Sequence, residues 1–252
     1  MDWRLTLAGL VVGTLAGISG IGGGSLLAPI LILLFGVKAA VAVGTDLLYS
    51  VPMKALAAYT HLRQGTVDRR VILMLCLGGV PGAIVGLLVF AYLRAHIGEA
   101  ALERTLRHAI GIVILCAAAA TLVVHILLQR IKPQPRPRTA ATVTIGAVVG
   151  FLVALTSIGS GSITLPLLLL VLPAVPLRQL IGSEIVFAAV MIPVAAVGHV
   201  AFANVDWMMA FSLMLGAVPG AYLGARLCVR LGENTLRPAV IGVLAFAGFK
   251  LL

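Results

Sequence analysis

Charged side chains are scarce in this chain of 252 residues, and acidic ones are the scarcest. Only 10% of residues are charged, with 18 Lys and Arg against 8 Asp and Glu, while 61% are hydrophobic. Soluble domains carry charge on about a quarter of their residues. The chain therefore lacks the polar side chains that would cover a large soluble helical core. Its composition predicts a membrane protein.

Cysteine is also rare, and the spacings that indicate catalysis or metal binding are missing. The three cysteines, Cys76, Cys116 and Cys228, stand singly inside apolar runs, so we expect them to pack rather than to form disulfides. The chain has no His-Glu-x-x-His motif, no paired Ser and Lys nucleophile and no convincing Cys and His arrangement. We therefore expect no catalytic residues, no metal and no cofactor. An intramembrane enzyme stays open as an alternative.

Apolar runs, by contrast, recur along the whole chain. About 20 apolar residues cross a bilayer as a helix, so the runs predict an all-α polytopic membrane protein. The first run follows Arg4 as in a signal peptide, but no small-residue cleavage site follows it, and we expect it to stay as a helix. The runs are Leu5–Ile18, Leu26–Phe35, Leu47–Tyr59, Val71–Tyr92, Ala109–Leu128, Ala140–Leu155, Ile163–Val175, Ile185–Phe202, Trp207–Ala225 and Ala239–Leu252.

The sequence contains an internal repeat. Residues 11–29 (VVGTLAGISGIGGGSLLAP) align without gaps on residues 148–166 (VVGFLVALTSIGSGSITLP), and nine of these 19 positions are identical. Further pairs follow in the same order: Gly44-Thr45-Asp46 with Gly182-Ser183-Glu184, His61 with His199, Val67-Asp68 with Val205-Asp206, residues 78–86 with 216–224, and residues 105–107 with 235–237. We predict two homologous transmembrane repeats of about five segments each, residues 1–129 and 139–252, joined by the Pro- and Arg-rich linker 130–138.

The distribution of Lys and Arg predicts how the repeats are oriented. Five crossings per repeat would make the repeats inverted, whereas a segment that turned back would make them parallel. Five crossings place more Lys and Arg on the side of the linker, as expected for cytoplasmic loops. We expect an inverted repeat in a bacterial inner membrane, with a cytoplasmic linker and periplasmic termini. The net charge of +10 then reflects residues beside anionic lipid and not a nucleic-acid partner.

Both repeats contain a glycine-rich break after the first apolar run. Such breaks at corresponding positions of two repeats indicate a transporter site near the middle of the membrane, where free backbone N–H groups attract anions. The candidate binding residues at the breaks are Ser19, Gly20, Gly22, Gly23, Gly24 and Ser25, with Thr156, Ser157, Gly159, Ser160, Gly161 and Ser162. The alternative is close helix crossing, which we favour for the four-residue spacing of Gly78, Gly82 and Gly86, and of Gly216, Gly220 and Gly224.

Ionisable residues inside apolar runs extend the candidate site. Asp46 and Glu184 correspond to each other, follow Thr45 and Ser183, and serve either at the site or as caps of helix N-termini. Lys54 has no basic counterpart, because the second repeat has Ile192 there. We expect Lys54 to pair with a carboxylate or to bind substrate.

Two histidines also correspond between the repeats. His61 and His199 precede Asp68 and Asp206 by seven residues each. Two roles stay open for them, an interfacial hydrogen bond or a proton relay.

Together these motifs resemble one family. The double glycine break, the Gly-Thr-Asp motif at 44–46 with Lys54 downstream, residues 61–68 (HLRQGTVD) and residues 78–83 (GGVPGA) are similar to those of the sulfite exporter TauE/SafE family. The second repeat departs from the pattern, with Ser157 and Ser160 replacing glycine and Glu184 replacing aspartate.

The resemblance implies a secondary transporter. It would export a small anion, sulfite or a related organosulfonate, by alternating access at the repeat interface. A membrane assembly subunit that transports nothing is the other alternative. The sequence carries no signal for an oligomeric state.

Overall fold

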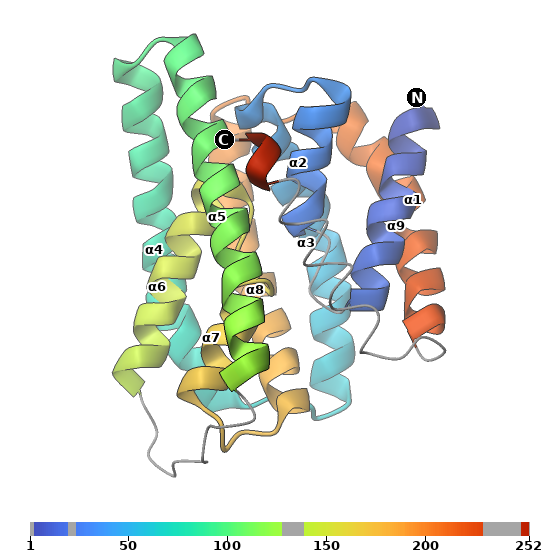
Figure 1. Ribbon diagram of the computed structural model, residues 1–252, viewed down its shortest axis with the longest axis vertical. Coiled ribbons are helices and arrows are strands. Elements are labelled where there is room, and N and C mark those ends of the chain that lie inside the picture. Colours follow the sequence, from blue (N-terminus) through green and yellow to red (C-terminus); the bar gives the residue numbers. More distant parts are fainter. Residues whose placement is uncertain (1–2, 20–23, 128–138, 229–247, 252) are drawn as a thin grey trace.

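The computed structural model describes residues 3–19, 24–127, 139–228 and 248–251, and within them every regular element is a helix (Figure 1). This confirms the all-α class. The helices are α1 (Trp3–Ser19), α2 (Gly24–Phe35), α3 (Ala39–Arg63), α4 (Arg69–His96), α5 (Glu99–Leu127), α6 (Thr139–Thr156), α7 (Thr164–Val171), α8 (Leu177–Ala201) and α9 (Trp207–Cys228).

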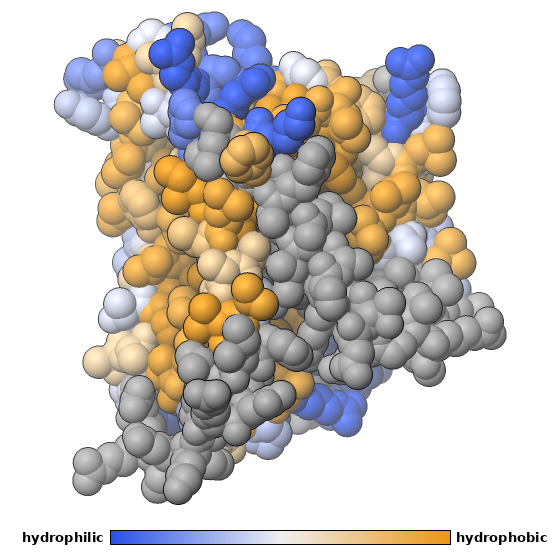
Figure 2. All heavy atoms as spheres, viewed as in Figure 1, coloured by the Kyte–Doolittle hydropathy of each residue, from blue (hydrophilic) through white to orange (hydrophobic). Residues whose placement is uncertain are grey.

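The outer surface of the bundle is apolar, as lipid contact requires. Four described helices, α4, α5, α6 and α8, contain spans long and apolar enough to cross a membrane. Large side chains such as Leu34, Leu73 and Val197 are mostly exposed to the surroundings. In Figure 2 the coloured residues in the middle of the visible face are mostly hydrophobic, and hydrophilic residues gather along its upper edge. The expectation of a polytopic membrane protein is confirmed.

The two helices that follow the glycine breaks are short. α2 has 12 residues and α7 has 8, which correspond to lengths of about 18 and 12 Å. The hydrocarbon core of a bilayer is about 30 Å thick. Neither helix can cross it alone, so the apolar runs at these positions do not each form a complete spanning helix.

Each half packs its helices against the other half through glycines. α1 lies along α9, and α4 lies along α6. A Cβ atom at Gly78 would collide with the backbone carbonyl of Val143, and one at Gly216 with that of Thr6. Gly82, Gly86 and Gly220 approach the partner backbones in the same way. The packing role expected for these glycines is confirmed.

At the centre, α3 and α8 pack in antiparallel orientation. Gly44, near the start of α3, faces His199 near the end of α8, and Gly182 faces His61 in the reciprocal arrangement. Figure 1 agrees, since α3 runs downward and α8 upward in that view. These two helices carry the ionisable residues identified in the sequence.

Candidate functional site

Asp46 and Glu184 lie inside helices and do not cap them. α3 begins at Ala39 and α8 at Leu177, so each carboxylate is the eighth residue of its helix. The Asp46 residue is fully buried and Glu184 is 3% exposed. The capping interpretation is therefore wrong. Each apolar run begins directly after the charged residue, whereas each helix begins seven residues before it.

The single basic residue of α3's interior pairs with a carboxylate of the other half. Lys54 Nζ lies 3.6 Å from Glu184 Oε1, and their side chains are 13% and 4% exposed. The separation satisfies an ion pair but exceeds an ordinary N–H···O hydrogen bond. Of the two partners expected for Lys54, the structure forms the pair with the carboxylate.

Asp46, the counterpart of Glu184, is in a different environment. Neither of its carboxylate oxygens has a hydrogen-bond partner among the described residues. The Ser157 hydroxyl lies beside it, close enough to interact electrostatically. The residue that corresponds to Lys54 is Ile192, which is 3% exposed.

The hydroxyl groups of Thr45 and Ser183 form hydrogen bonds between the two halves. Thr45 Oγ1 accepts a hydrogen bond from the backbone N–H of Asp206 at 3.1 Å, and Ser183 Oγ accepts one from the N–H of Asp68 at 2.8 Å. Asp68 caps α4 and Asp206 caps α9 through their carboxylates. Both hydroxyls were candidates for substrate binding, and the structure engages both with backbone.

The second break is a buried loop between α6 and α7. Ser157, Gly159 and Gly161 have φ angles of 60°, 131° and 88°, outside the range that most side chains adopt. Ser157 stands where the first half has Gly20, and a non-glycine residue in this conformation costs about 1–2 kcal/mol. Thr156 Oγ1 donates to the Leu152 carbonyl at 2.7 Å and accepts from the Ile158 N–H at 3.2 Å. Strain of this kind concentrates at functional sites.

Polar groups in this loop are left with spare hydrogen-bonding capacity. The Ser162 hydroxyl is buried and has no partner among the described residues. Ser160 is partly buried. Gly159 itself accepts hydrogen bonds from Ile163 and Thr164 through its carbonyl. The loop therefore combines a strained backbone with a buried hydroxyl that has no partner among the described residues.

The first break is only partly described. α1 ends at Ser19 and α2 begins with Gly24 and Ser25. Gly20, Gly22 and Gly23 lie outside the described residues. Their proposed role stays a prediction.

The two histidines form different hydrogen bonds. His61 Nδ1 lies 2.8 Å from Thr66 Oγ1, and His199 Nε2 lies 2.9 Å from the Ala154 carbonyl. His199 is fully buried and packs against Phe90. It thus connects α8 to the end of α6 just before the break.

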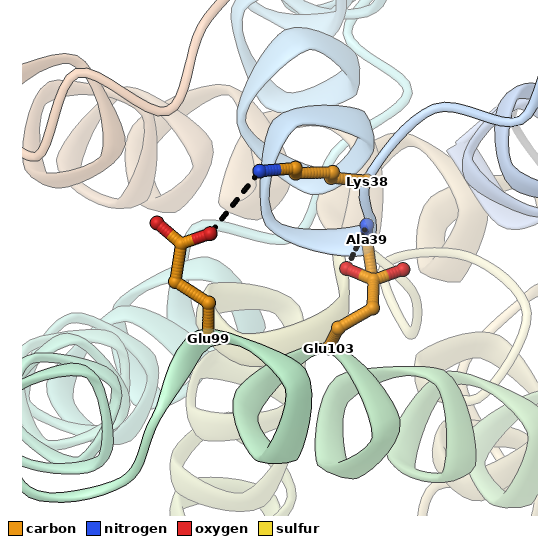
Figure 3. A network of polar contacts seen from close by, with 4 residues as sticks. All are labelled: Lys38, Ala39, Glu99 and Glu103. Carbon is orange, nitrogen blue, oxygen red and sulfur yellow. Dashed lines mark hydrogen bonds and ion pairs between the residues drawn. The ribbon is translucent and has the colours of Figure 1, made fainter.

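One positioning contact is not apparent from the sequence motifs. Glu103 of α5 accepts a hydrogen bond at 2.7 Å from the backbone N–H of Ala39, the first residue of α3, and Lys38 pairs with Glu99 at 3.2 Å (Figure 3). Helix N-termini carry unsatisfied N–H groups, and a carboxylate stabilises them. The N-terminus of α3 is thus capped by a residue of another helix, 64 residues away in the chain. No local sequence motif indicates such a contact.

No group of three His, Cys, Asp or Glu residues is placed to hold a metal in the part of the chain that the structure describes. Among the described residues, the candidate site comprises an ion pair between the two halves, a carboxyl group without a hydrogen-bond partner and a strained loop. This combination is consistent with anion handling inside a membrane.

Comparison with known proteins agrees with this reading. Residues 5–251 match the profile of the family described as sulfite exporter TauE/SafE. The chain belongs to that family. It is 34% identical over 261 residues to a probable membrane transporter protein, YjnA, of Bacillus subtilis, and the match covers all of both chains. The same organism's probable membrane transporter protein YdhB is 23% identical, over 98% of this chain and 99% of its own. No solved structure gives a significant match.

As a TauE/SafE family member, the protein is a membrane transporter and not an enzyme. The family and its relatives leave open which anion moves, in which direction and by which residues.

Proposed function

We propose that the protein exports a small sulfur-containing anion, sulfite or an organosulfonate, by alternating access around a site between α3 and α8. The observation that carries the proposal is the ion pair between Lys54 and Glu184. A buried ammonium group inside a membrane protein is costly and marks substrate or ion pathways. The family's description supplies the sulfur-containing substrate class.

The ion pair suggests how binding is linked to gating. Glu184 belongs to one half and Lys54 to the other, and their 3.6 Å separation leaves the ammonium incompletely bonded. A sulfite oxyanion offers Lys54 negatively charged oxygen atoms, as the Glu184 carboxylate does. Substrate would then displace the carboxylate and release one contact between the halves. Rigid-body movement of one half against the other is the usual basis of alternating access.

We further propose that residues 1–129 and 139–252 are inverted repeats separated by a cytoplasmic linker, with periplasmic termini. The antiparallel packing of α3 and α8 supports this, because the two helices are counterparts in the repeat. The reciprocal bonds of Thr45 and Ser183 support it too. The breaks would then meet near the middle of the membrane from opposite sides.

Flux of labelled sulfite into proteoliposomes that contain the purified protein tests the proposal. We expect uptake well above that of protein-free vesicles. Absence of flux for sulfite and for small sulfonates, from protein that is monodisperse in detergent, would favour the assembly-subunit alternative.

A further inference from the structure

We propose that Asp46 is a proton-binding residue that couples anion movement to a proton gradient. The inference deepens the proposed function and rests on it for its transport part. The two halves have similar sequences but differ in the residues that surround their corresponding carboxylates.

The asymmetry lies in the partners of the two corresponding carboxylates. Asp46 corresponds to Glu184, and Lys54 corresponds to Ile192, with the same offset of 138 residues. In the second half, Ile192 therefore stands at the position from which Lys54, in the first half, reaches Glu184. Since isoleucine carries no charge, Asp46 lacks the cation that its counterpart has.

Among the described residues, none forms an ion pair with Asp46. Asp46 is fully buried, and both of its oxygens lack a hydrogen-bond partner among the described residues. An ionised carboxylate that is buried without a counter-ion costs so much that the group takes up a proton instead. The geometry therefore favours the neutral carboxylic acid, with the Ser157 hydroxyl beside it.

Several titratable groups on the helices packed against α3 have partners other than Asp46. From α8, Glu184 pairs with Lys54 and His199 bonds to the Ala154 carbonyl. From α5, Glu103 holds the Ala39 N–H and Arg107, and Glu99 pairs with Lys38. At the start of α9, the Asp206 carboxylate caps the helix. The described side chains of α2 include no titratable group. On α3 itself, Tyr49 lies near Asp46, and Lys54 is eight residues away.

The location of Asp46 connects its proton to transport. Its neighbour Ser157 is the first residue of the strained loop, and Ser162 in the same loop has a free buried hydroxyl. If the halves rearrange around this loop, Asp46 meets water on one side and then on the other. In each cycle the carboxylic acid releases its proton to water on one side and the carboxylate takes one from water on the opposite side.

Transport by the Asp46→Asn variant tests the coupling, because asparagine resembles the protonated acid and cannot ionise. In proteoliposomes the exchange of labelled for unlabelled sulfite, measured for wild type and for the variant, gives the rate against which the net flux of each protein is compared. Net flux should no longer respond to an imposed pH gradient. Tyr49→Phe, which removes a neighbouring titratable hydroxyl from the same helix, is the matched control and should keep the response. A response to the pH gradient that persists in Asp46→Asn would overturn the proposal.

Infrared spectroscopy tests the protonation without any substrate. Wild-type protein at pH 7 should show the C=O stretch of a buried carboxylic acid, shifted by isotopic labelling of aspartate and missing in Asp46→Asn. If no aspartate-dependent band of this kind is present in the labelled wild type, the proposal is wrong even if sulfite is carried. If the band is present and no anion is carried, the proposed function fails and the proton site stands.

Discussion

Lys54 and Asp46 lie on the same helix, eight residues apart, in opposite electrostatic surroundings. Lys54 pairs with Glu184 of the other half, whereas Asp46 lies beside Ser157, and Ile192 occupies the position that corresponds to Lys54. On one helix the two are about 12 Å apart along the axis, too far to pair directly. Each therefore depends on what α8 and the α6–α7 loop present to it.

Removal of the lysine charge should weaken anion binding. In Lys54→Met the side chain keeps its bulk, and a charged contact worth about 1.5–3 kcal/mol is lost, so affinity for sulfite should fall at least about tenfold in a binding measurement on purified protein. Lys54→Arg should retain part of the affinity, because the charge persists while the donor geometry changes.

A second variant separates the loss of binding from a loss of folding. Lys54→Met leaves Glu184 buried without its cation, and breaking a buried pair in this way is destabilising. The double variant Lys54→Met with Glu184→Gln removes both charges and should recover the thermal stability but not the affinity. Wild-type affinity in either variant would show that Lys54 is structural.

At single residues the sequence was informative about chemistry and less so about partners. Lys54, Asp46 and Glu184 were identifiable because charge inside an apolar run is expensive. The hydroxyls of Thr45 and Ser183 were equally visible, yet they bond to the backbone of the other half. Only the fold brings residue 45 to residue 206, so no local pattern could reveal this use.

At the level of helices, glycine serves two separate purposes. In α4 and α9 it allows backbones to touch, and in the α6–α7 loop it permits unusual φ angles. Sequence spacing distinguished the two, because close contacts repeat every four residues and the breaks do not. The spacing did not reveal where α3 and α8 begin, since the Gly-Thr-Asp and Gly-Ser-Glu motifs resemble helix starts but lie inside the helices.

The α4–α6 contact should not tolerate a side chain at Gly78. Its Cβ would collide with the Val143 carbonyl, so Gly78→Leu must push two backbones apart and should cost about 3 kcal/mol. Thermal unfolding in detergent measures the loss. Gly98→Ala is the matched control, because no atom lies within 4 Å of a Cβ there, and it should unfold like wild type. An unchanged unfolding temperature for Gly78→Leu would contradict the packing described here.

The first break should be required for transport rather than for folding. Gly23→Val replaces a glycine of the Gly22–Gly24 run with a β-branched residue that restricts the backbone. We expect sulfite flux to be abolished in protein that still elutes as a monodisperse species. Normal flux would return Gly23 to the group of packing glycines.

In the whole molecule, the most extensive helix contacts join the two halves to each other. α1 of the first half packs on α9 of the second, α6 of the second packs on α4 of the first, and α3 and α8 cross between them. Because corresponding helices make corresponding contacts, the duplicated sequence already implied a symmetric molecule. The sequence did not reveal that α1 and α4 pack on helices of the other half, because an alignment of the two repeats carries no information about which helices are in contact.

An inverted repeat makes a prediction that a parallel one does not. Gln64, directly after α3, and Ala201, the last residue of α8, lie at the same end of two corresponding helices and are exposed. If the repeats are inverted, these positions face opposite sides of the membrane, whereas parallel repeats would put them on one side. Ala174, in the exposed connection before α8, should share the side of Gln64, and Gly98 should share that of Ala201.

Single cysteines at these positions, in a background without Cys76, Cys116 and Cys228, allow the sides to be read with a membrane-impermeant maleimide. In intact cells we expect Gly98→Cys and Ala201→Cys to be labelled. Gln64→Cys, Ala174→Cys and a cysteine at linker position 134 should react only after the membrane is opened. Gly98 carries the cysteine without steric cost, because its surroundings are open, so failure to label there reflects its side and not its burial. Labelling of Gln64→Cys and Ala201→Cys from the same side would rule out the inverted arrangement, and labelling of position 134 in intact cells would rule out a cytoplasmic linker.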